Sequence, residues 1–78
     1  MYNIIQLNEK DNVAVAAMNI PPNSCIKKNL VSKDQIPFGH KIAISKIEKD
    51  SFVYKYGQII GKSSKTIIPG EHVHSHNL

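Results

Sequence analysis

The sequence predicts a small all-β fold, an irregular β-clip or barrel of short strands with little helix. Two observations support this prediction. Apolar residues occur in short runs that are rich in β-branched and aromatic side chains. Glycine, proline and clusters of small polar residues interrupt these runs about every eight to twelve residues. No internal repeat or linker-like change in composition is apparent, so residues 1–78 are expected to form a single domain.

Two strands are expected before the adjacent prolines Pro21 and Pro22. Residues 3–7 hold isoleucines and a leucine in a polar frame, and residues 8–12 form a polar turn. Residues 13–18 form an apolar run, which predicts a strand that is buried on both faces. Pro21 and Pro22 end this run early, which favours a strand over a helix.

The middle of the chain is less regular. Residues 25–36 fit either short strands or one turn of helix, and the pattern leaves both open. Cys25 is the only cysteine, so no disulfide can form within the chain, and we expect it to be a small buried hydrophobe. Residues 37–40 then form a turn in which Gly39 can take a positive φ.

Four further strands precede the C-terminal end, and they are expected at residues 41–45, 52–56, 58–60 and 66–68. The second of these alternates three aromatic side chains against Val53 and Lys55, which is typical of a half-buried strand. Glycines flank the third strand. Pro69 and Gly70 form a strong turn dipeptide that ends the fourth.

Three of the four histidines lie near the C-terminal end, at a spacing of two residues. In an extended strand over residues 72–76, His72, His74 and His76 would stand on one face. Such a row favours a metal ion or an anionic ligand. Three histidines from one strand converge on one ion only if the backbone twists, so two of them with groups from elsewhere fit better. A purification remnant and a frayed, solvated strand end are the alternatives.

The charge of the chain limits its partners. The net charge is +4, and all ten positive charges are lysines, with no arginine. Arginine has the planar guanidinium group that forms paired hydrogen bonds with phosphates and base edges, and this chain has none. The aromatic residues are also not interleaved with a basic cluster, as they are in many RNA-binding domains. Nucleic acid is therefore not expected as a partner, whereas a small acidic metabolite or an acidic protein is. No secretory segment or membrane-length apolar run is present, so the cytoplasm is the expected location.

Four blocks of sequence then point to a known family, namely DNVAVA at residues 11–16, GHKIA at 39–43, KYGQIIG at 55–61 and GEHVHSHN at 70–77. In this order and spacing they resemble the N-terminal SAF domain of the altronate and galactarate dehydratase family. The resemblance runs from about Ile4 to Asn77. The same module occurs as a separate small subunit in some altronate dehydratases and in sulfolactate sulfo-lyase. The resemblance implies a β-clip, similar to the type III antifreeze domain.

The resemblance also implies a reaction, β-elimination from a sugar acid. A base removes the proton α to the carboxylate, and the β-hydroxyl leaves as water; in the sulfo-lyase the leaving group is sulfite. A divalent metal, Fe²⁺ or Mn²⁺, would act as a Lewis acid. The implied partners are a large catalytic dehydratase subunit and the sugar acid, so catalysis by this chain alone is not expected.

Other functions stay open at this point. SAF-like modules also occur in sialic acid synthases and in flagellar and pilus assembly proteins, so the fold does not fix the function. The main alternative is therefore a stand-alone module that binds carbohydrate or anions. A metal-carrying protein and association with a second copy of the chain are further alternatives.

The expected site residues are His40 for proton transfer, Asn12, Lys41, Lys55 and Asn77 for substrate binding, and His72, His74 and His76 for the metal. Lysines can neutralise a carboxylate, and a histidine whose pKa is near neutrality can transfer a proton. The asparagines can bind hydroxyl groups or hold the histidine strand in place. Each residue also has a structural alternative: solvated lysines, a satisfied turn histidine at position 40 and a turn cap at position 12.

Overall fold

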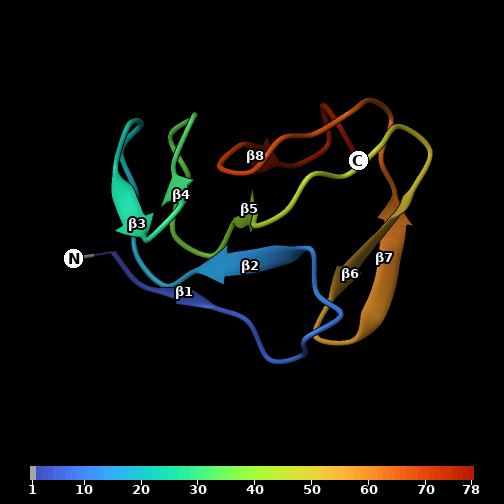
Figure 1. The fold of residues 1–78 in the computed structure, drawn as a ribbon, viewed down its shortest axis with the longest axis horizontal. Helices are drawn as coiled ribbons and strands as arrows, with labels where there is room; N and C mark the ends of the chain where they lie inside the picture. Colours follow the sequence, from blue (N-terminus) through green and yellow to red (C-terminus); the bar gives the residue numbers. More distant parts are fainter. Residues whose placement is uncertain (1) are drawn as a thin grey trace.

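The computed structural model describes residues 2–78, which form eight short strands (Figure 1). The strands are β1 (Ile4–Ile5), β2 (Val13–Ala16), β3 (Cys25–Lys27), β4 (Leu30–Val31), β5 (Lys41–Ala43), β6 (Phe52–Lys55), β7 (Gln58–Lys62) and β8 (His72–Val73). None of residues 2–78 is helical, which confirms the predicted all-β class. Within that range there is accordingly no helix long and apolar enough to cross a membrane.

A four-stranded antiparallel sheet forms the centre of the molecule, in the order β1-β2-β5-β8. In β2, Val13 pairs with Ala43 of β5, and Ala14 pairs with Ile42. Because side chains alternate along a strand, these two pairs point to opposite faces of the sheet. All four residues are fully buried, so the apolar run that contains β2 is covered on both faces as predicted.

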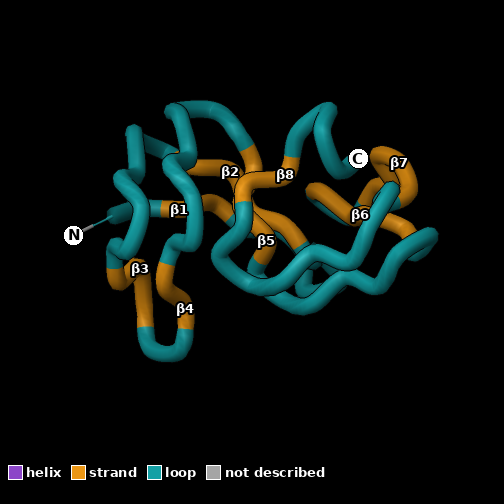
Figure 2. The backbone as a smooth tube through the Cα atoms, turned by 90° about the horizontal axis from the view of Figure 1, so that it is seen from above, coloured by secondary structure: helices purple, strands orange, loops and turns teal. Residues whose placement is uncertain are grey.

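Each face of the sheet contributes to a separate hydrophobic core. The first core contains Ala14, Ala16, Ile20, Ile26, Leu30, Ile36 and Ile42. The second contains Val13, Ala43, Ile47, Val53, Ile67 and Val73. The β3–β4 hairpin belongs to the first core and the β6–β7 hairpin to the second, and the two hairpins lie at opposite ends of the molecule (Figures 1 and 2).

The two ends of the molecule repeat one structural unit, and they share β5. Equivalent main-chain pairs close the units, Ile20↔Ile36 and Ile47↔Ile67. Equivalent serine hydroxyls donate to loop carbonyls, Ser32 to Pro21 at 2.7 Å and Ser63 to Glu48 at 2.6 Å. Equivalent glycine amides donate to the last residue of the first strand of each unit, Gly39 to Ala16 of β2 at 2.9 Å and Gly70 to Ala43 of β5 at 2.8 Å.

The predicted absence of an internal repeat is therefore wrong. The sequence carries a faint signature of the repeat, I-x-x-[ND]-S-x-[IV] at residues 20–26 and again at residues 47–53. The offset between equivalent positions is 27 residues before the hairpins, from Ile20 to Ile47, and 31 after them, from Ser32 to Ser63. A repeat whose period changes part-way does not stand out in the sequence.

The region whose structure the sequence left open is the β3–β4 hairpin. Asn29 lies in its turn with a φ of 67°, a conformation that asparagine tolerates better than most residues. In β3 the side chain of Ile26 points to the first core, so Cys25 and Lys27 point outward. The predicted burial of Cys25 is therefore wrong, since its side chain is exposed.

The remaining strands are close to their predicted positions, but several have different lengths. β6 ends one residue early because Tyr56 has a φ of 55° and belongs to the hairpin turn. β7 extends through Gly61 to Lys62. Residues 66–68 contribute one isolated bridge, at Ile67, rather than a strand.

Candidate functional site

The C-terminal histidines do not form the continuous strand that their spacing predicts. β8 contains only His72–Val73, and residues 75–77 form a turn. Asn77 closes this turn, because its backbone N–H donates to the carbonyl of His74 at 3.1 Å. The predicted row of three histidines on one strand is therefore wrong. The ring of His76 lies in the turn, tilted by 37° from that of His72 with 5.6 Å between the centroids.

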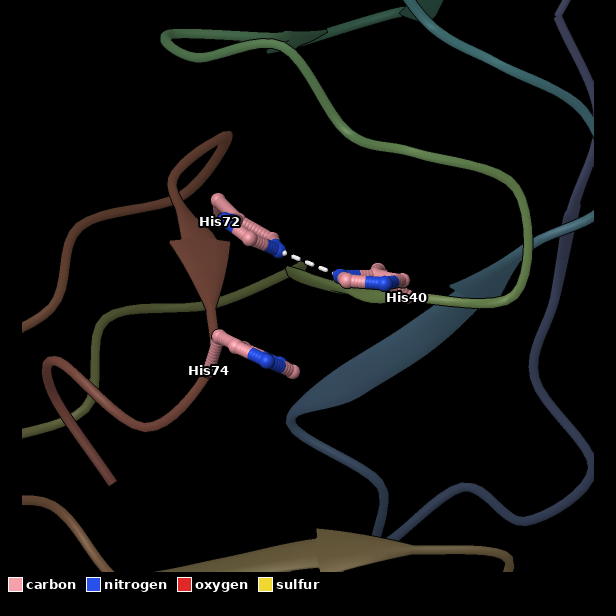
Figure 3. Close-up of side chains that lie close together, drawn as sticks. All are labelled: His40, His72 and His74. Carbon is pink, nitrogen blue, oxygen red and sulfur yellow. Dashed lines mark hydrogen bonds between the residues drawn. The ribbon is translucent and has the colours of Figure 1, made fainter.

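His40 takes the third place beside His72 and His74 (Figure 3). The register of β5 and β8 pairs Ile42 with His72, so His40, two residues before Ile42, faces His74. Alternation then places His40 and Ile42 on the same side of their strand. His40 joins His72 and His74 because of a long-range strand register, which no local spacing in the sequence shows.

The three imidazoles form a compact stack that is open on one side. Nδ1 of His40 and Nε2 of His72 lie 2.9 Å apart, in a hydrogen bond whose direction depends on the tautomers. The ring centroids are 4.7 Å apart for His40 and His74, and 5.3 Å apart for His72 and His74. One ring nitrogen from each histidine lies within 4.8 Å of the other two. His40 and His72 are half-buried and His74 is exposed, so the cluster is accessible at His74.

The surroundings of His72 favour its neutral form. Burial lowers the pKa of His72, and the charges of His40, His74 and His76 lower it further, partly offset by Asp34. Asp34 has a second role that the sequence did not indicate: its Oδ2 accepts the backbone N–H of His72 at 2.9 Å. A neutral imidazole is the form that binds metal ions or accepts a proton.

Asn77 holds the histidine turn, which is one of the two roles expected for it. Its side chain is only 2 % exposed. Its Nδ2 donates to the carbonyl of His72 at 2.9 Å, and its Oδ1 accepts the N–H of His74 at 2.9 Å. Both ends of the amide are therefore engaged by the backbone on either side of Val73, and the side chain faces inward rather than toward a ligand.

Asn12 has a comparable role at the other end of the sheet. Its Nδ2 donates to the carbonyl of Phe52 at 3.0 Å, and its Oδ1 accepts the N–H of Tyr54 at 2.8 Å. The side chain of Asn12 thus forms hydrogen bonds with the backbone groups of β6 that face away from β7. These contacts belong to β6 rather than to the histidine cluster.

Lys41 and Lys55 lie near each other, but apart from the histidines. Lys41 alternates with His40 along the chain, so its side chain points to the opposite face of the sheet. Burial lowers the pKa of Lys41, and the charge of Lys55 lowers it further. The ammonium of Lys55 also lies 5.4 Å from the ring centroid of Tyr56. The predicted site residues therefore fall into a histidine group and a lysine group.

The sequence did not single out Asp11, which joins the N-terminal loop to the β6–β7 turn. Its Oδ1 accepts the N–H of Gly57 at 2.8 Å, and its Oδ2 accepts the N–H of Asn8 at 3.3 Å. Burial raises the pKa of Asp11, but the backbone amides of Gly57, Tyr56, Asn8 and Leu7 together outweigh it and hold the pKa below its usual value. The signal that could have found Asp11 is its place in the first of the four sequence blocks.

Comparison with known proteins confirms the resemblance seen in the sequence. The model of the altronate/galactarate dehydratase SAF domain matches residues 2–78. The chain belongs to this family. The SAF domain is 39% identical over 80 residues to altronate dehydratase of Bacillus subtilis (strain 168), an alignment that covers 99% of this chain and 16% of that protein.

Two further relatives of this SAF domain are alpha subunits of (2R)-sulfolactate sulfo-lyase. The subunit from Chromohalobacter salexigens is 50% identical over 46 residues, which are 59% of this chain and 49% of that subunit. The subunit from Paracoccus pantotrophus is 42% identical over 48 residues, which are 62% of this chain and 72% of that subunit. The chain thus spans about a sixth of the altronate dehydratase and about half of the first sulfo-lyase subunit.

Proposed function

We propose that this SAF domain acts in a metal-dependent sugar-acid dehydratase of the altronate type. In this proposal it is the small-subunit or N-terminal part, and it supports elimination of water from an aldonate or aldarate. The single observation that carries the proposal is the 39% identity to altronate dehydratase over 99% of the chain. Because the chain corresponds to only 16% of that protein, a large catalytic subunit or region would supply the other catalytic groups.

The histidine cluster would serve the elimination step. Neutral imidazoles can accept a proton, the role expected for His40, or they can bind a divalent metal ion. When such an ion is bound, it can polarise the carboxylate or the leaving hydroxyl. The lowered pKa of His72 supports either use, because it keeps an imidazole neutral near pH 7.

The lysine group would bind the carboxylate of the sugar acid. Burial lowers the pKa of Lys41 and the nearby charge of Lys55 lowers it further, and an anion between the two lysines would relieve that repulsion. Lys41 points to the opposite face of the sheet from His40, and Lys55 lies near Lys41 on β6. In this proposal the large partner therefore holds the substrate at the end of the sheet, where both the lysines and the histidines can reach it.

The outer face of the β6–β7 hairpin is where we place the large subunit. Val53 points to the second core, so Phe52 and Ile59 point away from it and are 45% and 53% exposed. The ammonium of Lys62 lies 5.5 Å from the ring centroid of Phe52. An apolar face with lysine at its edge fits a partner surface that is apolar with acidic residues around it. A second copy of this chain, which also carries +4, fits it less well.

A sulfo-lyase alpha subunit is the second candidate function. The observation that favours it is that the chain covers 72% of the alpha subunit from Paracoccus pantotrophus, at 42% identity. The altronate-type function is preferred, because the match to altronate dehydratase covers 99% of the chain whereas the sulfo-lyase matches cover 59% and 62%.

The experiment that tests the proposal is capture of the partner, followed by reconstitution. The chain is used as bait in extract of its own cells, and the captured protein is identified by mass and purified. The mixture should convert altronate or a related aldonate to a 2-keto-3-deoxy acid, whereas either chain alone should not. Release of sulfite from sulfolactate would select the second candidate. Full activity of the large chain without this one would contradict both, and tight sugar-acid binding by the lone chain in calorimetry would favour a stand-alone binding module.

A further inference from the structure

We propose that His40, His72 and His74 form a site for one divalent transition-metal ion within this chain alone, and that His76 is not a ligand. The site would be a three-histidine site with its other coordination positions open. This inference goes beyond the proposed function, because it requires neither a partner nor a substrate. It also gives His40 the role of a ligand instead of a proton carrier.

The spacing of the ring nitrogens fits a common ion after a small adjustment. Two imidazole nitrogens bound to one ion at about 2.1 Å can lie no more than about 4.2 Å apart. The nitrogens of His40 and His72 already lie 2.9 Å apart, and the whole group lies within 4.8 Å. The exposed ring of His74 can turn at its side-chain torsions to close the remaining distance.

The backbone positions of all three histidines are fixed by hydrogen bonds, so the chain holds the site before any ion arrives. His40 donates its N–H to Pro37 at 2.9 Å and accepts the N–H of Ala16 at 2.8 Å. For the other two, Asp34 accepts the N–H of His72, and Asn77 binds His72 and His74 through its side chain. Ligands whose backbone is held in this way need little further ordering when they bind.

The position of its ring argues against His76 as a ligand. Its ring is tilted from that of His72, and among residues 2–78 it is not part of any group of three metal-ligating side chains with mutually close donor atoms. His76 also lies within the turn of residues 75–77 that Asn77 closes, whereas His74 precedes it. The spacing of His72, His74 and His76 in the sequence therefore suggests a set of metal ligands that the fold does not bring together.

The donor set selects the class of ion. The group contains three imidazoles and neither a carboxylate nor a thiolate. Imidazole ligands suit Zn²⁺, Ni²⁺, Co²⁺ and Fe²⁺, whereas Mg²⁺ and Ca²⁺ prefer oxygen ligands. Three protein ligands with an open position are also the arrangement of catalytic zinc sites, which leaves room for water or a substrate oxygen.

The test is titration of the 78-residue chain with Zn²⁺ in a calorimeter, and with Co²⁺ while its visible absorption is recorded. We expect one ion per chain. His40→Ala, His72→Ala and His74→Ala should each weaken binding about tenfold or more, since each removes a ligand. His76→Ala is the matched control, because it removes a histidine from the same tail, and its affinity should stay within about twofold of the unaltered chain.

Circular dichroism and thermal melting of each variant show whether it is folded, and His40→Gln provides a second variant if His40→Ala does not fold. The inference is overturned if His76→Ala weakens binding as much as His74→Ala while the His40 variants bind normally, because the tail alone then chelates the ion. Absence of saturable binding also overturns it. Neither result affects the proposed subunit role, which is tested by reconstitution with the large chain.

Discussion

His40 and His74 face each other across the β5–β8 pair, with their ring centroids 4.7 Å apart and their planes inclined by 21°. The contact joins the end of the first structural repeat to the end of the second. The contact depends on the turn that follows β8, because the chain leaves the direction of the strand directly after His74. The residue that makes this turn is Asn77.

Replacing Asn77 with alanine should destabilise the fold and the histidine cluster together. The change leaves the carbonyl of His72 and the N–H of His74 without their side-chain partner, which should lower the free energy of unfolding by about 2 kcal/mol. Urea unfolding followed by circular dichroism measures this loss, and Zn²⁺ titration measures the effect on the cluster. Asn3→Ala is the matched control, because the Asn3 side chain is exposed. Equal unfolding midpoints for the two variants would contradict the role of Asn77.

Gly70 and Gly39 occupy equivalent positions in the two repeats, yet alanine should be tolerated at only one of them. Both have positive φ, +95° and +82°, so alanine is strained at either position by about 1–2 kcal/mol. At Gly39 an added Cβ meets nothing within 4 Å, whereas at Gly70 it overlaps the backbone carbonyl of Val31. Gly70→Ala should therefore cost at least about 4 kcal/mol.

Thermal melting of the two variants provides the measurement. Gly39→Ala should give a cooperative transition with a moderately lower midpoint, and Gly70→Ala should be largely unfolded at room temperature. Similar melting midpoints for both would show that the approach of Gly70 to Val31 is not a constraint in solution.

Replacing Asp11 with asparagine should remove part of the acid sensitivity of the fold. The pKa of Asp11 in the folded chain is lowered, so its stabilising contribution is fully present above the unfolded pKa of about 3.9 and is lost as the pH falls through the folded pKa. The unaltered chain should therefore be more stable than Asp11→Asn at pH 6 to 7. The difference should shrink as the pH falls below about 4 and the unaltered carboxylate is protonated.

Unfolding midpoints of the two proteins, measured from pH 2 to pH 7, provide the check. A constant difference across this range would show that Asp11 contributes no charge-dependent stability. Equal midpoints at every pH would show that its hydrogen bonds to the β6–β7 turn are dispensable.

Replacing Ile59 with glutamate should abolish association with the large subunit and leave the fold intact. Ile59 is 53% exposed on the outer face of the hairpin, so the change removes little core packing but places a negative charge against the apolar part of the partner surface. Gln58→Glu is the matched control, since it adds the same charge at the next exposed position. Capture of the partner from extract by both variants measures the effect. Equal capture would place the interface elsewhere.

The strand positions could largely be predicted from the sequence, because alternation and turn residues act locally. The run at residues 13–18 and the aromatic alternation at residues 52–56 each lie where a strand forms. Strand lengths were harder to predict, because they depend on which backbone groups find partners. Residues 66–68 have strand-forming side chains, but only Ile67 has a main-chain bridge.

The candidate site could be predicted only in part. His72 and His74 were expected to share a face, and their rings do stack, because the two residues flank Val73. His76 was expected to join them, but it lies in the turn of residues 75–77 that the buried Asn77 closes. His40 reaches the cluster through the pairing of β5 with β8. The register between β5 and β8, which lie far apart in the chain, cannot be read from a local sequence pattern.

The sharing of β5 between the two repeats also limits how the fold can be divided. β5 ends the first unit by pairing with β2, and it begins the second by pairing with β8. A chain cut after Ala43 would therefore leave one fragment with an unpaired edge at β5 and the other without its first strand. Each fragment would lack main-chain pairs that the other supplies, so we expect neither fragment to fold alone.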